Sequence, residues 1–108
     1  MGKFIALMGI DGHYYFNLLA SNGSVIFSSA GYTSHTERDK GLHTVQDHAF
    51  DHLRYERRIS KNGEYYFVMR TMDGEIIGTS QMYVSEASRD NAIEAVKNNA
   101  RDAEVEIA

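Results

Sequence analysis

Five histidines are the residues of this sequence best suited to metal or acid–base chemistry, and all lie between positions 13 and 52. They are His13, His35, His43, His48 and His52. His48 and His52 are four residues apart, a spacing that places two imidazoles on one face of an α-helix and that occurs in two-histidine zinc sites. Asp47 adds a carboxylate, so Asp47, His48 and His52 are weak candidates for metal ligands. The helix is expected to end near His48, which would leave His52 beyond it. We therefore predict exposed polar residues at a helix end, with no metal and no cofactor.

Tyrosine and serine are the other residue types with chemical potential, and several of them recur 51 positions apart. The recurring tyrosines and serines are Tyr14/Tyr65, Tyr32/Tyr83, Ser29/Ser80 and Ser34/Ser85. A serine nucleophile needs a base and an orienting acid in a defined geometry, and histidine is available as that base in only one half of the chain. We interpret the tyrosines as packing residues and the serines as turn and cap residues. No catalytic residue is predicted, and the chain is expected not to be an enzyme.

The recurrence extends over most of the chain and requires no gap. Residues 11–49 aligned with 62–100 give 13 identities in 39 positions. Such self-similarity indicates one structural unit written twice. Because a unit of about 50 residues has a marginal core when isolated, we expect one domain over residues 1–108. Its repeats are residues 1–51 and residues 52–108.

Turn signals and alternating side chains predict the elements within each repeat. The turn dipeptides are Asp11-Gly12, Asn22-Gly23, Asn62-Gly63 and Asp73-Gly74. They favour tight hairpins in which both central residues adopt positive φ. The alternation between them predicts strands over 3–8, 14–20, 25–29, 54–59, 65–71 and 75–80, with a short final strand over 103–107.

A helix is predicted near the end of each repeat. Ser34 with Glu37 has the form of a capping box, and Ser85 is the equivalent cap. The apolar stripes Leu42/Val45/Ala49 and Ile93/Val96/Ala100 would pack these helices on a sheet. The expected fold is α+β: two tandem β-β-β-α(-β) repeats form one pseudo-twofold domain, with a shared antiparallel sheet and two helices packed on it.

The sheet face opposite the helices is the candidate interaction surface. Tyr15 and Leu19 in the first repeat, with Tyr66, Val68 and Arg70 in the second, alternate with the predicted core residues and would lie on that face. Exposed apolar patches of several hundred Å² often mark interfaces. We hypothesise a surface for a partner protein or for self-association. The alternative is that another strand or loop covers it.

Composition excludes several classes of protein. The chain has no cysteine, so disulfides and thiolate chemistry are excluded. No apolar run reaches the length of a membrane-spanning helix, and we expect a cytoplasmic protein with no membrane contact. The net charge is −4, which disfavours nucleic-acid binding because that binding rests on neutralising phosphates. A local basic cluster, Arg54, Arg57, Arg58 and Lys61, is interpreted as a solvated strand face.

The chain resembles the YegP-like family of tandem-repeat bacterial proteins. The resemblance rests on Gly2-Lys3-Phe4, on Gly12, Tyr14, Phe16, Leu18, Ala20, Asn22 and Gly23, on Ser29, Tyr32 and Ser34, and on Val96-Lys97-Asn98-Asn99-Ala100 with Ala103 and Val105. It implies an α+β fold in which two β-β-β-α-β repeats build one sheet, and it implies little about activity.

Together these observations predict a small non-enzymatic interaction or accessory module with an unknown protein partner, as a monomer or a homodimer. Two alternatives stay open. One is weak binding of single-stranded nucleic acid on the aromatic sheet face, where bases could stack. The other is a small-molecule or metal site that uses the histidines of the first repeat.

Overall fold

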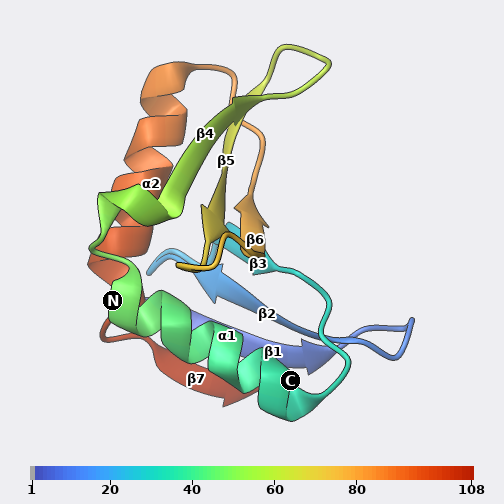
Figure 1. The fold of residues 1–108 in the computed structure, drawn as a ribbon. Coiled ribbons are helices and arrows are strands. Elements are labelled where there is room, and N and C mark those ends of the chain that lie inside the picture. Colours follow the sequence, from blue (N-terminus) through green and yellow to red (C-terminus); the bar gives the residue numbers. More distant parts are fainter. Residues whose placement is uncertain (1) are drawn as a thin grey trace.

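The computed structural model describes residues 2–108, which form seven strands and two α-helices (Figure 1). In chain order the elements are β1 Lys3–Met8, β2 Tyr14–Leu19, β3 Val25–Ser29, α1 His35–His48, the 3₁₀ turn η1 His52–Arg54, β4 Tyr55–Ile59, β5 Tyr65–Arg70, β6 Ile76–Ser80, α2 Glu86–Ala100 and β7 Glu104–Ile107. The predicted α+β fold of two strand–strand–strand–helix repeats is confirmed, and most element boundaries fall within one residue of those predicted.

All seven strands belong to one sheet in the order β4-β5-β6-β3-β2-β1-β7. The repeats join at β3 and β6, which pair antiparallel with Ser28 opposite Thr79. These two residues are equivalents in the 51-residue repeat. Outward from the junction the strands follow in the same order in both repeats, β3-β2-β1 and β6-β5-β4. One prediction is wrong: β7 pairs with β1 in parallel, which makes the sheet mixed rather than antiparallel. A strand that returns after a helical crossover can take this parallel orientation.

The four hairpin turns follow the predicted dipeptides, but not the predicted turn type. Gly12, Gly23, Gly63 and Gly74 have φ of 82°, 88°, 81° and 87°, and no other residue type among those described has positive φ. In the first turn the Gly12 N–H donates to the Gly9 carbonyl, and the Gly9 N–H donates to the His13 carbonyl. This is a three-residue loop that ends in a glycine bulge, and it requires positive φ at glycine alone.

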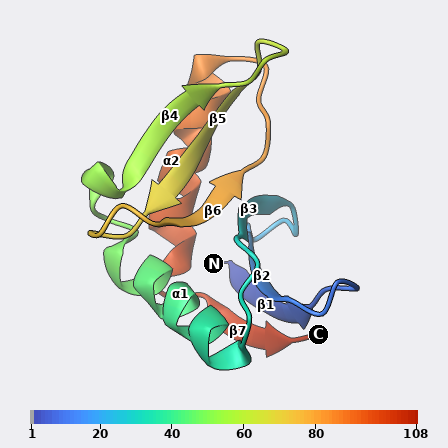
Figure 2. The ribbon, with the colours of Figure 1, turned by 45° about the vertical axis from the view of Figure 1, so that its right-hand side comes forward.

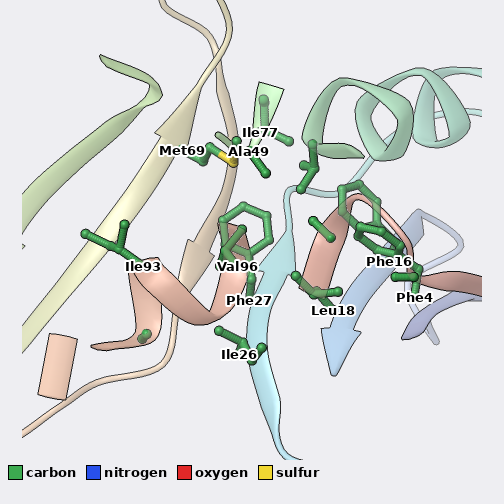
Figure 3. Packing of buried hydrophobic residues seen from close by; sticks show 14 of the residues in the cluster. Phe4, Phe16, Leu18, Ile26, Phe27, Ala49, Met69, Ile77, Ile93 and Val96 are labelled. Carbon is green, nitrogen blue, oxygen red and sulfur yellow. The ribbon is translucent and has the colours of Figure 1, made fainter. Parts of the chain in front are cut away.

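Each helix begins at its predicted serine cap. The Ser34 hydroxyl accepts the Glu37 N–H, and the Ser85 hydroxyl accepts the Ser88 N–H. The predicted stripes on both helices are buried, and they belong to one core cluster with Phe4, Phe16, Leu18, Phe67 and Met69 of the strands. Figure 3 shows part of this cluster. Alternate residues of a strand point to opposite faces of the sheet. Both helices contact the same set of alternate residues, so both pack on the same face of the sheet.

The centre of the core is asymmetric. Phe27 is fully buried, and its ring stacks on Phe67 at a centroid distance of 6.1 Å. The equivalent of Phe27 in the second repeat is Gly78, where a Cβ would lie 2.7 Å from Phe27 Cζ and 2.4 Å from the Ser28 carbonyl oxygen. The junction therefore has room for one phenylalanine, and the glycine provides that room.

The sheet twists strongly between its two halves. In Figure 1 strands β4 and β5 run in a clearly different direction from β1 and β2, with α2 along the former pair and α1 along the latter. Figure 2 shows the same division from a second direction. Neither helix is both long and apolar enough to cross a membrane. The face of the sheet away from the helices is called the open face below.

Candidate interaction surface

The open face of the first repeat carries a group of apolar side chains on β1 and β2. Register pairs Leu7 with Tyr15, Ile5 with Asn17, and Lys3 with Leu19, so the polar Asn17 lies between Tyr15 and Leu19 on β2. Phe4, Ala6, Phe16 and Leu18 alternate with these residues and are fully buried on the helix side. Ile5, Leu7, Tyr15 and Leu19 are half-buried. These four residues form the open-face patch.

Tyr15 is held firmly in the patch. Its hydroxyl donates a hydrogen bond of 2.6 Å to Asp11 Oδ2. A Cβ at Gly9 would lie 2.7 Å from the Tyr15 ring, and a Cβ at Gly31 would lie 3.0 Å from its hydroxyl. The ring therefore sits against two positions that have no side chain. The hydrogen bond from Tyr15 lowers the pKa of Asp11, with the His13 N–H contributing, and it raises the pKa of Tyr15. Asp11 is consequently a carboxylate at neutral pH.

Acidic groups surround the patch. Asp11 lies at its β1–β2 end, while Glu104 and Glu106 are exposed on β7, on the same face as Lys3 and Ile5. Lys3 Nζ lies 3.4 Å from Glu106 Oε1. Three carboxylates thus border the apolar patch, with one lysine among them.

Three of the four patch positions are charged in the second repeat, and the fourth, Tyr15, corresponds to Tyr66. Ile5, Leu7 and Leu19 correspond to Glu56, Arg58 and Arg70. Glu56 accepts hydrogen bonds from Arg58 and from Arg70, the latter at 2.9 Å. These contacts, with Arg58 first and Arg70 second, hold the pKa of Glu56 below its usual 4.5. The open face of the second repeat is therefore a polar network.

The residues of the predicted interaction surface divide between the apolar open face of the first repeat and the charged open face of the second. Tyr15 and Leu19 lie in the open-face patch, whereas Arg70 is engaged by Glu56 and by the Gly74 carbonyl at 2.5 Å. Tyr66 is half-buried. Val68 was expected to be exposed, but it is only 2% exposed. Its strand neighbours on that face are Tyr66 and Arg70, and Glu56 and Thr79 lie opposite it, so long side chains cover it.

The histidines are dispersed over several elements. His13 lies 3.4 Å from Asp11, and His43 Nδ1 lies 3.0 Å from Gln46 Oε1. His35 packs edge-on against the Tyr14 ring. His48 ends α1, while His52 lies in η1 beyond the helix, as the sequence predicts. Within residues 2–108 no three histidine, aspartate or glutamate side chains are placed to hold a metal ion.

Asp47, the third candidate ligand, faces a different environment. It lines a hollow of about 610 Å³ between the C-terminal ends of the two helices, together with Gln46, Ala49, Phe50, Lys97 and Arg101. Two of these side chains are cations, which oppose the binding of a metal ion through charge repulsion. Asp47 therefore shares this hollow with two cations and with neither His48 nor His52.

The recurring serines and tyrosines have structural roles. The Ser29 hydroxyl accepts the Phe16 N–H at 2.8 Å, and the Ser80 hydroxyl accepts the Phe67 N–H at 3.0 Å. Backbone bridges pair Tyr14 with Tyr32 and Tyr65 with Tyr83. Burial raises the pKa of Tyr32 and of Tyr83, which keeps both hydroxyls protonated. These contacts link the second strand of each repeat to the segment that leads from the third strand to the helix.

The sequence did not predict the role of two recurring arginines, Arg38 and Arg89. Arg38 and Arg89 are only 7% and 6% exposed, and each guanidinium carbon lies 5.6 Å from the ring centroid of Tyr14 or Tyr65. Cation–π contact of this kind stabilises a buried arginine. The signal was present, because arginine followed by aspartate recurs in both repeats, but a helical arginine ordinarily faces solvent.

Comparison with known proteins places the chain in a family. The family model described as a domain of unknown function, DUF1508, matches twice, over residues 10–56 and 60–106. The chain belongs to the DUF1508 family. The expected likeness to YegP is thereby confirmed: the UPF0339 protein YegP of Escherichia coli is 38% identical over 98 residues, covering 91% of this chain and 89% of YegP. A UPF0339 protein of Acinetobacter baylyi is 44% identical over 95 residues, covering 88% and 86% of the two chains.

Two solved structures share the fold. The solution structure of YegP from Escherichia coli superposes with a TM-score of 0.94 at 36% identity, covering 98% of this chain and 91% of that one. A UPF0339 protein from Shewanella oneidensis gives a TM-score of 0.92 at 34% identity, covering 98% and 90%. The first is described as a protein of unknown function. The fold is thus that of the family, and the function has to be sought in this chain's own surfaces.

Proposed function

We propose that this chain is a non-enzymatic binding module of the bacterial cytoplasm that contacts a protein partner through the open-face patch. The observation that carries the proposal is the position of Ile5, Leu7, Tyr15 and Leu19, grouped around Asn17 on adjacent strands whose other face is the core. No helix covers this side of the sheet (Figure 1). Apolar side chains grouped on an uncovered surface favour association with another apolar surface.

The surroundings of the patch specify the partner's chemistry. Asp11, Glu104 and Glu106 border it, so a partner with an apolar centre and a basic rim would complement it. Complementary rims steer association and select among partners. A single-stranded nucleic acid would instead place its phosphates near these carboxylates, which disfavours that alternative.

Rigidity supports the same proposal. Tyr15 is tethered to Asp11 and packed against Gly9 and Gly31, so little side-chain freedom remains to be lost on binding. Preordered aromatic residues are efficient contact residues for this reason.

The test is a comparison of three proteins as baits in a bacterial lysate: the wild type, Leu7→Lys with Leu19→Lys, and Arg70→Ala. Lysine at half-buried open-face positions would place charge in the patch without filling the core. Arg70→Ala is the matched control, because Arg70 is the second-repeat equivalent of Leu19. The expected partner is captured by the wild type and by Arg70→Ala, and is lost with the double lysine variant.

A partner that meets this criterion is then purified and titrated. We expect the double lysine variant to weaken its Kd by at least about tenfold, the loss typical of a disrupted apolar contact. Hydrogen exchange should slow at β1 and β2 in the complex. Equal capture by all three baits would refute the proposal, as would sedimentation showing that the patch joins two copies of this chain.

A further inference from the structure

The two repeats differ at the outer sides of their first strands. β1 and β4 are equivalent in the 51-residue repeat. β1 is flanked on its outer side by β7, which pairs with it in parallel from Lys3 to Ala6. β4 stands at the end of the sheet and, among residues 2–108, pairs only with β5 (Figure 2). The strand position beside β4 is therefore open, although the same position beside β1 is filled.

Connectivity explains the open position. Residues 104–107 of β7 correspond to residues 53–56 after the first helix. In the first repeat those residues lead directly into β4, so they cannot also lie beside it. At the start of β4, the Tyr55 N–H donates a hydrogen bond to the His52 carbonyl of η1. An edge strand presents unpaired N–H and C=O groups to any extended chain that reaches it.

Positive charge accumulates on both faces beside β4. On the helix side, Asp90 is shared by Arg57 at 2.9 Å and Arg89 at 3.2 Å. On the open face, Glu56 is shared by Arg58 and Arg70. These networks contain two carboxylates for four guanidinium groups.

The first repeat has no such excess. Its equivalents of Arg57 and Arg58 are Ala6 and Leu7, and Arg38 has its own aspartate, Asp39, at 3.1 Å. The cationic excess thus coincides with the one repeat whose first strand has an open side. This coincidence points to a ligand rather than to a general property of the fold.

The chain itself shows what fits such a position. β7 reads Glu104-Val105-Glu106-Ile107, and Glu106 pairs with Lys3 of β1. A second β4 would complement this edge less well than an acidic strand, because each β4 carries two arginines and one glutamate and two copies would add positive charge to positive charge. An acidic strand would instead meet the unbalanced arginines on β4.

We propose that the outer edge of β4 binds an extended, acidic segment of another protein as an added strand. Main-chain hydrogen bonds would supply affinity, and carboxylates beside Arg57 and Arg58 would supply selectivity. This site is separate from the open-face patch, so its test and that of the proposed function succeed or fail independently.

The probe is a fluorescent peptide with the sequence of residues 102–108, Asp-Ala-Glu-Val-Glu-Ile-Ala, acetylated and amidated. Its control carries lysine at the three acidic positions. We expect the acidic peptide to raise anisotropy on binding the full chain and the lysine peptide to stay free. Added salt should weaken binding, because the pairs are solvent-exposed.

Amide chemical shifts locate the bound peptide. The largest changes are expected in Tyr55–Ile59, with slower hydrogen exchange there, and with the amides of β7 unchanged. The double variant Arg57→Gln with Arg58→Gln should weaken the peptide's Kd by about tenfold, as two surface ion pairs allow. Lys3→Gln is the matched control on the covered strand β1, and it should bind as the wild type does.

Several outcomes would overturn the proposal. Absence of binding at low salt, equal binding of both peptides, or shift changes centred away from β4 would each do so. Concentration-dependent sedimentation of the unliganded wild type, abolished by Arg57→Gln with Arg58→Gln, would assign the edge to a second copy of this chain instead. The peptide comparison uses wild-type protein, so it decides the matter even if the double variant fails to fold.

Discussion

The two repeats share most of their core positions on the helix face of the sheet and differ more on the open face. On the helix face, Phe16 and Phe67 are both fully buried, and so are Val45 and Val96 of the two helices. On the open face, apolar Leu7 and Leu19 stand where the second repeat has Arg58 and Arg70. The helix face therefore maintains the fold in both repeats, while the open face of each has its own surface chemistry.

The junction between the repeats limits how far even the helix face can match. Phe27 and Gly78 are equivalent positions on neighbouring strands, and a side chain at 78 would enter the space of the Phe27 ring. Two phenylalanines would overpack this centre, and two glycines would leave it hollow. A duplicated unit that shares one core has to differ at its centre.

The largest expected effect comes from breaking this central pair. Phe27→Ala should lower the free energy of unfolding by about 3–5 kcal/mol, the cost of emptying a buried phenylalanine site. Gly78→Ala should lower it by about 1–3 kcal/mol through overpacking against Phe27 and the Ser28 carbonyl. Urea denaturation followed by circular dichroism measures both. A Gly78→Ala protein as stable as the wild type would contradict the proposed crowding.

A second test asks whether the repeated serines are equivalent. Ser29→Ala and Ser80→Ala each remove the acceptor of a phenylalanine N–H, at Phe16 and Phe67. Leaving a buried donor without an acceptor costs about 1–3 kcal/mol. We expect both variants to lose stability in that range and by similar amounts. A loss at only one position would show that the two repeats differ in the scaffold as well as on the surface.

Much of the fold was predictable because its signals are local. Alternation between glycine turns located the strands, and Ser34 and Ser85 located the helix starts. The bulges were not predictable, because Ile26 and Ile77 depart from strict alternation and both are buried in the core. A bulge turns a side chain to the other face, and a single sequence gives no signal for its position.

The candidate surface was predicted less well, because exposure depends on neighbours distant in the sequence. Leu19 and Val68 both occupy open-face positions, yet Val68 is covered by the side chains around Glu56 and Arg70. The parallel pairing of β7 with β1 joins residues about 100 positions apart, and no local pattern indicates it. Which edge of the sheet stays open therefore followed only from the structure.

A third test changes Gly41 of α1, which lies against Tyr32, and its equivalent Ala92 of α2. A Cβ at Gly41 would lie 2.4 Å from the Tyr32 hydroxyl, whereas the equivalent position in α2 is the buried Ala92. Ala92→Gly should cost about 1 kcal/mol from helix propensity. Gly41→Ala should also be destabilising by about 1 kcal/mol, because crowding against Tyr32 outweighs the propensity gain. A stabilised Gly41→Ala protein would refute this explanation of the helix glycine.

The smallest expected effect is on the pH dependence of thermal stability, and it distinguishes the open face of one repeat from that of the other. The contacts of Arg58 and then Arg70 lower the pKa of Glu56 from 4.5 in the folded chain. A carboxyl group whose pKa is lower when folded stabilises the fold above its unfolded pKa, and this stabilisation is lost as the pH falls through the folded value. The wild type should therefore lose more thermal stability between about pH 5 and pH 2 than Glu56→Gln does.

Asp11→Asn is the matched variant in the first repeat, where the hydrogen bond from Tyr15 lowers the pKa of Asp11 in the same direction. Both variants should flatten the acid limb of the profile of Tm against pH. Glu56→Gln removes contacts with charged arginines, which salt weakens. Asp11→Asn removes a contact with a neutral donor, which salt affects less. Raising the ionic strength should thus reduce the Glu56 contribution more than the Asp11 contribution. Profiles that respond equally to salt would show that the charge difference between the two open faces has no measurable effect on stability. That charge difference would then act only in the binding of partners.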